Sequence, residues 1–383
     1  MINILLHGGT TDPSGNVGDA LMLHEVIRRC VGRFGQDVVF SVRDSVGGYE
    51  KLFDSRFASV SSPPELLGRN PFRRYLPRLQ WCVKERVYGS SSASEQNVDC
   101  ILNFMGYRNG DIGENAGFYA TRRDAFDYRR WKWQGKKVIH LPQAFGPFRD
   151  GRGAGLFKEI VACSDRIFCR DATSFRQVYD VAGEQSHVSI SPDITIGADA
   201  EVTGNSSLSG KFAIIPNRWM FERVSSEEKA GYTRSLIETV KGCIKESVEP
   251  VFVIHAPFQD DEIVNSLQAS MPMRLRVFRE ADPLKMKYAL GLCHGIYSSR
   301  YHGVLAGLTQ NVPTLCSSWS HKYQALLDDY EVPFLMFSNA PDALRDYCLG
   351  SEREAVIRTL RLANSRLRKR VESMWSEVWS LIG

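Results

Sequence analysis

Residues 166–174 read RIFCRDATS, and residues 295–303 read GIYSSRYHG. Each stretch opens with a short run that fits a buried strand and continues into polar residues that fit the start of a helix. Strands that are apolar throughout are typical of parallel sheets, because helices cover both faces of such a sheet. The two stretches lie in different halves of the chain, so they predict two α/β domains of similar kind.

The same alternation of strand and helix extends outward from both stretches. In the first half we expect strands at residues 2–6, 38–41, 98–104, 138–141 and 166–169. In the second half we expect strands at residues 212–215, 251–255, 275–278, 295–298 and 313–316. The stretch 197–210 between them is small and polar, as in a linker. This pattern predicts two Rossmann-like domains facing across a cleft, over residues 1–196 and 211–345.

The last segment, residues 351–383, is predicted to be one helix. Its apolar residues recur at spacings of three and four: Val356, Leu360, Ala363, Leu367, Val371, Met374 and Val378. Such spacing gathers them in one stripe along the helix. A stripe of this length must pack on another part of the protein, so we expect the helix to return to the first domain.

Composition excludes several classes of protein. The chain has 383 residues, of which 43% are hydrophobic and 24% charged, as in ordinary globular proteins. A net charge of +4 is too small to indicate a nucleic-acid partner. The nine cysteines include no CxxC pair and read as buried thiols in a reducing compartment. No apolar run approaches the roughly 18 residues of a membrane span, and no leader pattern is visible, so we expect a cytoplasmic protein.

Polar residues that directly follow strands are the first candidates for a site, because open α/β sheets bind ligands beyond the carboxyl ends of their strands. Ser299, Arg300 and His302 combine a hydroxyl, a fixed cation and a group that titrates near neutral pH. Arg170 follows a strand of the first half in the same way. Each also has a structural alternative, since Arg170 could pair with a carboxylate and His302 could be a packed core residue.

Three more loops are candidate sites. Asp19 follows a glycine-containing turn and could cap the helix that begins there, although the turn lacks the GxGxxG pattern of dinucleotide sites. Asn217 and Arg218 follow the first strand of the second half and would open onto the same cleft. Gln143 ends a strand and could bind a sugar hydroxyl, or it could belong to a rigid turn. No spacing of His, Cys or acidic residues indicates a metal site.

Taken in order, these motifs resemble the polysaccharide pyruvyl transferase family over about residues 3–335. The stretches that carry the resemblance are 16–19, 143–147, 170–174, 192–193, 299–303, 321–323 and 326–327. Their order and spacing are more specific than any one of them. The resemblance implies a fold like that of the GT-B glycosyltransferases. It also implies phosphoenolpyruvate as the donor, a cyclic pyruvate ketal on a sugar as the product, release of phosphate, and no metal or other cofactor.

The resemblance also implies roles for individual residues. Arg170 matches the family's donor-binding arginine, and Arg300 and His302 match its Arg-x-His motif. Two cations suit a donor with a carboxylate and a phosphate, and a protonated His302 could supply a proton to the methylene carbon or the phosphate. The predicted catalytic residues are His302 and Asp19. The predicted donor-binding residues are Arg170, Arg300, Ser299, Tyr301, Asn217 and Arg218. The predicted acceptor-binding residues are Asn16, Gly18 and Gln143.

Two stretches rich in basic and aromatic residues, 71–88 and 128–137, suggest a further partner. Such surfaces favour the interface of an anionic membrane, where a lipid-linked oligosaccharide acceptor would be presented. Alternatively, these two stretches could form an ordinary solvent-exposed surface, or a surface that binds sugars. The membrane hypothesis predicts an exposed patch made of Arg73, Arg74, Arg78, Trp131 and Trp133.

Two other functions stay open at this stage. A GT-B glycosyltransferase that uses a nucleotide-sugar would share the architecture, and Glu280 is its candidate for contacting ribose. A non-catalytic protein that binds a saccharide or another protein is the second alternative. The presence of Arg170, Arg300 and His302 argues against a non-catalytic role.

Overall fold

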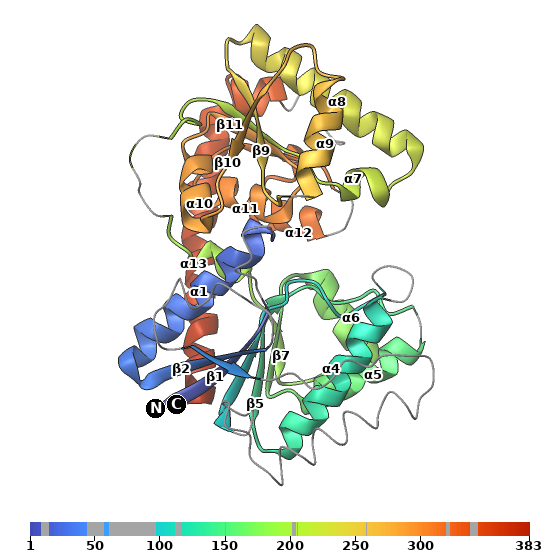
Figure 1. The fold of residues 1–383 in the computed structure, drawn as a ribbon, viewed down its shortest axis with the longest axis vertical. Coiled ribbons are helices and arrows are strands. Elements are labelled where there is room, and N and C mark those ends of the chain that lie inside the picture. Colours follow the sequence, from blue (N-terminus) through green and yellow to red (C-terminus); the bar gives the residue numbers. More distant parts are fainter. Residues whose placement is uncertain are drawn as a thin grey trace.

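The computed structural model describes residues 1–8, 15–43, 57–60, 97–111, 116–149, 151–200, 204, 206–257, 259–318, 322–337 and 344–383. Within these residues the chain forms two separate sheets whose strands all run parallel. Figure 1 shows one sheet with its helices below the other. The predicted α/β fold with two Rossmann-like halves is therefore confirmed.

The first sheet has seven strands in the order β3-β2-β1-β4-β5-β6-β7. Their bounds are β1 Ile2–His7, β2 Val38–Arg43, β3 Phe57–Val60, β4 Cys100–Asn103, β5 Lys137–Gln143, β6 Arg166–Cys169 and β7 Val188–Ile190. Its helices are α1 Val17–Phe34, α4 Ala116–Trp133, α5 Gly151–Cys163, α6 Ala172–Ala182 and the short η4 Ile194–Ile196. We call this sheet with these helices the N-terminal unit.

The second sheet has five strands in the order β10-β9-β8-β11-β12. Their bounds are β8 Phe212–Ile215, β9 Pro250–Ile254, β10 Arg276–Arg279, β11 Gly295–Ser298 and β12 Thr314–Cys316. Its helices are α7 Trp219–Glu222, α8 Ser226–Lys245, α9 Gln259–Gln268, α10 Pro283–Gly291, α11 Tyr301–Leu308 and α12 Lys322–Asp329, followed by η5 Pro333–Leu335 and η7 Leu344–Leu349. We call this sheet with these helices the C-terminal unit.

The strands of the first sheet are buried on both faces, as the apolar runs predict. Leu102 packs on the face covered by α1, whereas its neighbour Ile101 belongs to the core under α4 and α5. Successive side chains point to opposite faces of a strand, so one strand contributes to two cores. This explains why the strand sequences show no polar alternation.

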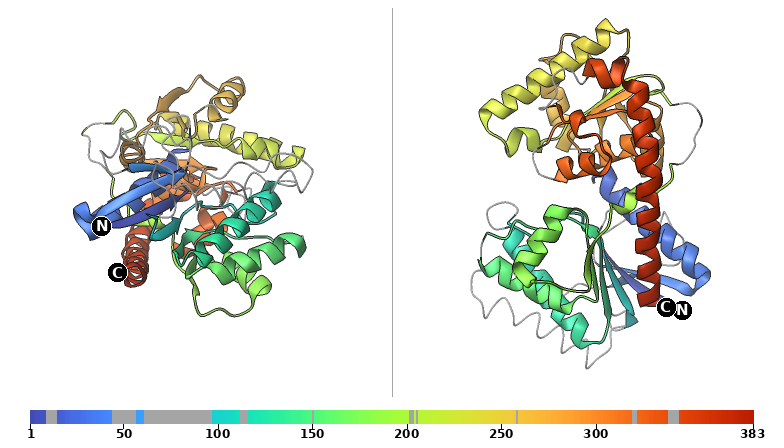
Figure 2. Two further views of the ribbon diagram at one scale, coloured as in Figure 1. Left: turned by 60° about the horizontal axis from the view of Figure 1, so that its bottom comes forward. Right: turned by 180° about the vertical axis from the view of Figure 1, so that it is seen from behind.

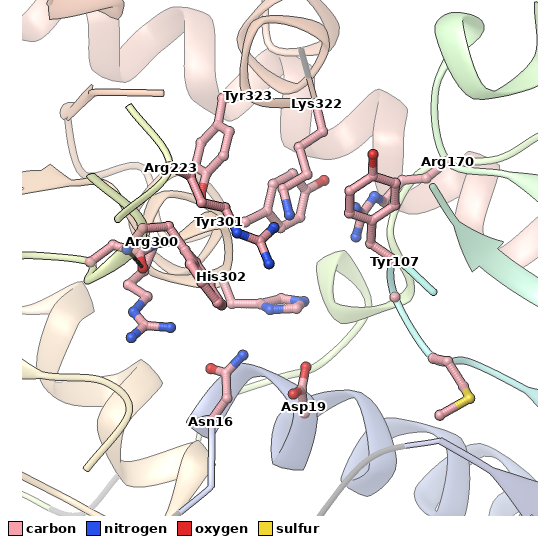
Figure 3. A pocket seen from close by; sticks show the side chains of 14 residues that line it. Asn16, Asp19, Tyr107, Arg170, Arg223, Arg300, Tyr301, His302, Lys322 and Tyr323 are labelled. Atoms are coloured by element: carbon pink, nitrogen blue, oxygen red, sulfur yellow. Dashed lines mark hydrogen bonds between the residues drawn. The ribbon is translucent and has the colours of Figure 1, made fainter. Parts of the chain in front are cut away.

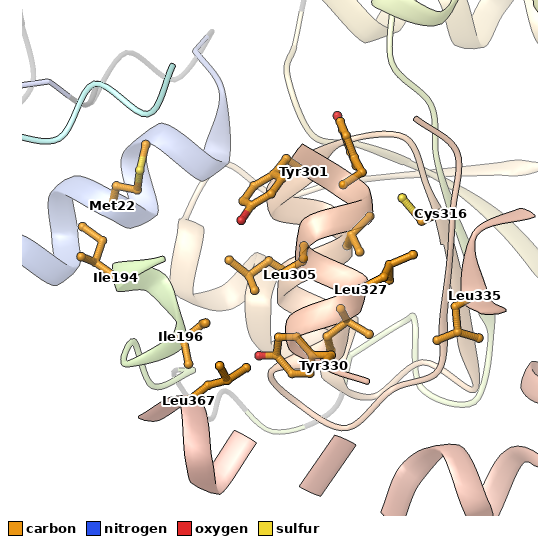
Figure 4. Packing of buried hydrophobic residues seen from close by; sticks show 14 of the residues in the cluster. Met22, Ile194, Ile196, Tyr301, Leu305, Cys316, Leu327, Tyr330, Leu335 and Leu367 are labelled. Carbon is orange, nitrogen blue, oxygen red and sulfur yellow. The ribbon is translucent and has the colours of Figure 1, made fainter. Parts of the chain in front are cut away.

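Helix α1 belongs to the N-terminal unit, but its first turn contacts the C-terminal unit. The backbone N–H of Val17 donates to the carbonyl oxygen of His255, just beyond β9, at 3.1 Å. Farther along the helix, Met22 packs into a core that is shared by both units and includes Ile194 of η4 and Leu305 of α11 (Figure 4). The two units are therefore joined by a continuous apolar core.

The last helix, α13 Arg353–Ile382, is 30 residues long and spans both units (Figure 2). Its upper part follows the C-terminal unit, and its lower part packs on the N-terminal unit, as predicted. There Arg29 donates to both carboxylate oxygens of Glu372 at 2.6 and 2.5 Å, and Arg166 pairs with Glu377 at 2.8 Å. The chain termini lie side by side in all three views.

The structure corrects the predicted membrane patch at Trp131. This side chain is fully buried, because α4 turns it toward the sheet, where its indole meets the His7 ring edge-on at 5.6 Å. Trp133 is 70% exposed, since it lies on the other side of the same helix. Arg73, Arg74 and Arg78 lie outside the described residues. In the part of the chain that is described, no helix is long and apolar enough to cross a membrane.

The position of Leu367 predicts how strongly α13 contributes to stability. Leu367 is fully buried against Ile196, whereas Leu362 on the opposite side of the same helix is 75% exposed. Leu367→Ala should lower the free energy of unfolding by about 2–5 kcal/mol, and Leu362→Ala should change it by less than about 0.5 kcal/mol. Urea denaturation followed by circular dichroism measures both. Equal effects of the two substitutions would show that α13 does not pack as described.

Candidate active site

A cavity of about 260 Å³ lies where the two units meet (Figure 3). This volume is near the lower end of the roughly 300–1,000 Å³ typical of small-molecule sites. The N-terminal unit lines it with Asn16, Asp19, Met105, Gly106, Tyr107 and Arg170. The C-terminal unit lines it with Asn217, Trp219, Arg223, Arg300, Tyr301, His302, Lys322 and Tyr323. Met105, Arg170, Asn217 and Arg300 lie within two residues of a strand end, where ligands of parallel sheets bind.

A buried carboxylate connects the two units at this cavity. Arg170, which follows β6, donates from Nη1 to Oδ2 of Asp193 at 3.0 Å. The same oxygen lies 3.8 Å from Nε2 of His302 in the other unit. Burial would raise the pKa of Asp193, but the facing His302 and Arg170 together lower it below its ordinary value. Asp193 is therefore ionised and holds Arg170 in place.

A second buried ion pair holds the other predicted arginine. Arg300 donates to Asp260 at the start of α9, and the same carboxylate accepts the backbone N–H of Ala256 at 2.8 Å. Burial raises the pKa of Asp260, although Arg300 opposes the shift. Both arginines thus have fixed orientations, because each is tied to a buried carboxylate that is itself hydrogen-bonded.

Lys322 at the start of α12 is the third cation of the cavity. Its ammonium lies 5.3 Å from the ring centre of Tyr107 and 5.5 Å from that of Tyr301. Burial, followed by the charge of Arg170, lowers the pKa of Lys322 to about 7. Asp19 faces it from α1, and burial raises the pKa of that carboxyl although Lys322 opposes the shift. Both groups can therefore change protonation closer to neutral pH than ordinary lysines and aspartates.

His302 lies in the first turn of α11, between the cations and helix α1. Burial lowers its pKa to about 4, and Asp193 opposes that shift without cancelling it. The imidazole is therefore neutral near pH 7 in the protein without ligand. Helix α1 approaches it so closely that a Cβ added to Gly18 would collide with the ring. Glycine at this position is required by the close contact between the two helices.

Seven of the predicted site residues line the cavity: Asn16, Asp19, Arg170, Asn217, Arg300, Tyr301 and His302. Tyr301 is placed under Arg170, whose guanidinium lies 4.1 Å from the ring centre. Asn16, rather than Asp19, caps helix α1, since its side chain accepts the N–H of Gly18 at 3.0 Å. Asp19 lies in the first turn and faces the cavity (Figure 3). The catalytic and binding roles of these residues stay predictions.

Four predicted residues do not line the cavity, and each is held by other contacts. Gln143 is fully buried and donates to Nδ1 of His140 at 2.9 Å, away from the cavity lining. Ser299 Oγ lies 2.7 Å from the Tyr232 hydroxyl, behind the cavity wall. Gly18 lies against the ring of His302, which itself lines the cavity.

Arg218 is the fourth of these residues, and it points along α7. Its Nε pairs with Glu222 at 3.2 Å, one helical turn away. The structure brings Trp219 and Arg223, on either side of that turn, to the cavity instead. Sequence reasoning selected the arginine nearest to the strand, but the direction of this short helix decides which arginine faces inward.

The other lining residues were not predicted from single motifs: Met105, Gly106, Tyr107, Trp219, Arg223, Lys322 and Tyr323. Tyr107 lies three residues beyond the strand expected at residues 98–104, so its position after a strand could have indicated it. Lys322 was part of a quoted motif, but no property of the motif showed that it faces the cavity. Among the described residues, no group of three or more His, Cys, Asp or Glu side chains is arranged to hold a metal ion.

Comparison with known proteins decides the family. Residues 16–321, most of the chain, match the family described as polysaccharide pyruvyl transferase. The chain belongs to this family. The resemblance seen in the sequence is thereby confirmed, and the protein is a transferase of polysaccharide biosynthesis. No curated protein sequence matches the chain.

Solved structures similar to this family member share its fold. Anabaena HepE in complex with UDP-glucose has a TM-score of 0.59 at 10% sequence identity, and the match covers 99% of this chain and 100% of that one. UDP-GlcNAc 2-epimerase from Neisseria meningitidis, bound to UDP-GlcNAc, has a TM-score of 0.57 at 11% identity, with the same coverage of 99% and 100%. At this identity the likeness shows the GT-B-like fold alone.

The contact between Gly18 and His302 gives a prediction with a matched control. Gly18→Ala should lower the free energy of unfolding by about 1–3 kcal/mol, because the added methyl group forces α1 and α11 apart. Gly32→Ala, in the same helix, meets no atom within 4 Å and should raise it by about 0.5–1 kcal/mol. Chemical denaturation of both variants tests this. A stabilised Gly18→Ala protein would contradict the described packing.

Proposed function

We propose that this protein transfers the pyruvyl group of phosphoenolpyruvate to two hydroxyls of one sugar, forming a cyclic ketal and releasing phosphate. The observation that carries the proposal is the convergence of Arg170, Arg300 and Lys322 on one small cavity between the units. The donor has two anionic groups, a carboxylate and a phosphate, on a three-carbon frame. A small cavity lined by several fixed cations fits such a ligand.

The buried ion pairs support this fit because they orient the arginines before the donor arrives. Arg170 is held by Asp193 at 3.0 Å, and Arg300 is held by Asp260. A guanidinium has five N–H groups, more than one carboxylate can accept, so an arginine tied to a carboxylate can also donate to a ligand. Donors that are already in place stabilise an anion without a further entropy cost at the moment of binding.

In the first step, one sugar hydroxyl attacks the carbon that bears the phosphate, and the neighbouring methylene carbon takes a proton. We assign Asp19 as the base that removes the hydroxyl proton and His302 as the acid that protonates the methylene carbon. The donor brings up to three negative charges beside His302. These charges favour the protonated imidazole, so the low pKa of His302 in the ligand-free protein should rise when the donor binds.

In the second step, a second hydroxyl of the same sugar displaces the phosphate and closes the ketal. The new carbon–oxygen bond forms as the bond between that carbon and the bridging phosphate oxygen breaks. The proton of the second hydroxyl goes to His302, which is neutral after the first step, or leaves on the phosphate. Lys322 and Arg170 would stabilise the departing anion. The balance of the two steps requires no oxidant or reductant.

We place the acceptor sugar beside Tyr107 and Asp19, which line the cavity from the N-terminal unit, because the earlier candidate Gln143 is buried. The family implies a glycan acceptor. We further propose that this acceptor is a lipid-linked oligosaccharide, which a cytoplasmic protein would bind at the membrane surface. Of the predicted membrane patch, Trp133 is the member that is seen exposed.

A nucleotide-sugar donor has less support, since Glu280 lies outside the cavity and accepts the N–H of Asp282 at 2.9 Å.

The proposal is tested by mixing the protein with phosphoenolpyruvate and a panel of acceptor glycans. Phosphate should be released only with the correct acceptor, and mass spectrometry should show the acceptor with one ketal-linked pyruvyl group. The same panel with UDP-sugars is the control. Transfer from a UDP-sugar, with no phosphate release from phosphoenolpyruvate, would contradict the proposal.

The two members of the Arg-x-His motif should fail in different ways. Arg300→Ala should weaken donor binding by about 1.5–3 kcal/mol, because one charge-assisted contact is lost. His302→Gln should bind the donor nearly as well and turn over about 10²–10⁴-fold more slowly, because a glutamine amide is too weak an acid to protonate carbon. Donor titration and single-turnover rates separate the two effects. A His302→Gln enzyme with unchanged turnover would exclude the acid role.

Lys322 should make donor binding depend on pH. A lysine is charged below its pKa, so with a pKa of about 7 Lys322 loses its charge as the pH rises through neutrality. Affinity for the anionic donor should then fall between about pH 6 and pH 8. Lys322→Arg keeps the charge and should remove this decline, while the titration of the donor itself is the same for both proteins. Parallel curves for the two proteins would contradict the role given to Lys322.

A further inference from the structure

Arg223 has an unusual position at the cavity, just after the short helix α7. The residue is exposed to solvent on one side, yet it also lines the cavity, and Figure 3 shows its guanidinium near Lys322 and Tyr301. Its guanidinium carbon lies 3.7 Å from the ring centre of Trp219. Sequence patterns gave no indication of this residue, because it follows neither a strand nor a recognisable motif.

We propose that Arg223 binds the phosphoryl group of the donor, together with Lys322 and Arg170. This inference rests on the proposed function and adds a donor-binding residue to it. Arg223 would be the cation on the solvent side of the group, where phosphate enters with the donor and leaves as product.

The charges around the cavity support an anion at this place. Arg170 and Arg300 each have a buried carboxylate partner, Asp193 and Asp260. Arg170, Arg223 and Arg300 all act to lower the pKa of Lys322 by charge repulsion, in addition to burial. Cations that repel one another in this way are stabilised by an anion bound between them.

The contact with Trp219 supports a binding role for Arg223 in particular. The guanidinium carbon lies 3.7 Å from the centre of the indole ring, and the N–H groups that point away from the ring can donate to phosphate oxygens. The contact also limits the conformations of a long side chain, so less entropy is lost on binding. Burial lowers the pKa of Arg223, and the neighbouring Glu222 and then Tyr107 oppose that shift. Arg223 and Tyr107, which belong to different units, line the same cavity.

The arrangement assigns the phosphoryl group, rather than the carboxylate, to Arg223. Figure 3 shows Arg223 and Lys322 on the side of the cavity opposite Asn16 and Asp19, while Arg300 points down toward Asn16. A phosphate has more charge and one more oxygen than a carboxylate, so it suits the side with the larger number of cations. We therefore assign the carboxylate of the donor to Arg300.

Arg218 provides a matched control for the test. It belongs to the same segment, and its guanidinium carbon also lies near the Trp219 ring, 4.7 Å from the ring centre, but it pairs with Glu222 and does not line the cavity. Binding of inorganic phosphate, measured by isothermal titration calorimetry, should be about tenfold or more weaker for Arg223→Ala, the loss expected for one charge-assisted contact. Arg218→Ala should bind phosphate within about twofold of the unchanged protein. Equal binding by both variants, weakened or not, would overturn the inference.

Pyruvate probes the carboxylate side and separates the two anionic groups. Arg223→Ala should bind pyruvate within about threefold of the unchanged protein, whereas Arg300→Ala should lose pyruvate more than phosphate. A larger loss of pyruvate than of phosphate in Arg223→Ala would overturn the phosphoryl assignment. These arms need no turnover, so they are independent of the proposed reaction. Phosphate binding that depends on Arg223, in a protein that never releases phosphate from phosphoenolpyruvate, would count against the proposed function alone.

A pH series gives a readout that a merely structural role of Arg223 would not change. The charged and titratable groups that face Lys322 are Asp19, Arg170, Arg223, Arg300, His302, Tyr107, Tyr301 and Tyr323. Removing Arg223 removes one repelling charge, so Lys322 should keep its proton to higher pH. With sulfate as the probe, which does not titrate in this range, the decline of binding should move to higher pH in Arg223→Ala and stay in place in Arg218→Ala. An unmoved decline in Arg223→Ala would overturn the inference.

Discussion

The carboxylate of Asp193 is the contact on which the geometry of the site depends. It lies between Arg170 of its own unit, at 3.0 Å, and His302 of the other unit, at 3.8 Å, with all three side chains buried. Electrostatic interactions are strong where water is excluded, and an ionised group left there without a partner would be costly. Its own unit satisfies this carboxylate through Arg170 and Thr195, and the register in which the two units meet places His302 beside it. That register also determines the distance between Arg170 and the cations of the C-terminal unit.

Three features of the chain hold the units in this register. The first turn of α1 is hydrogen-bonded to the loop after β9, and Gly18 in that turn packs against the ring of His302. Helix α13 follows both units and ends in ion pairs with Arg29 and Arg166. A continuous apolar core lies between these contacts. The site is thus built at an interface that is itself well packed, which is how cations can be positioned for an anion before it binds.

The sequence predicted the parts of the site that depend on topology alone. Arg170, Arg300 and His302 follow parallel strands, so the rule about carboxyl ends of strands was enough to bring them together. Side-chain direction could not be predicted in the same way. Gln143 turns into the core, where the register of β5 against β6 shifts just before it. Arg223 rather than Arg218 faces the cavity because of the course of one four-residue helix. Trp131 could have been placed correctly, since it recurs at helical spacing with the buried Tyr128.

The central claim is that both units together bind one anionic donor. A crystal structure of the protein soaked with phosphoenolpyruvate tests it most directly. The account predicts donor oxygens within hydrogen-bonding distance of Arg170 from the N-terminal unit and of Arg300 and Lys322 from the C-terminal unit, with His302 beside the methylene carbon. A donor that contacts one unit only, or a cavity that takes a nucleotide-sugar in its place, would contradict the account.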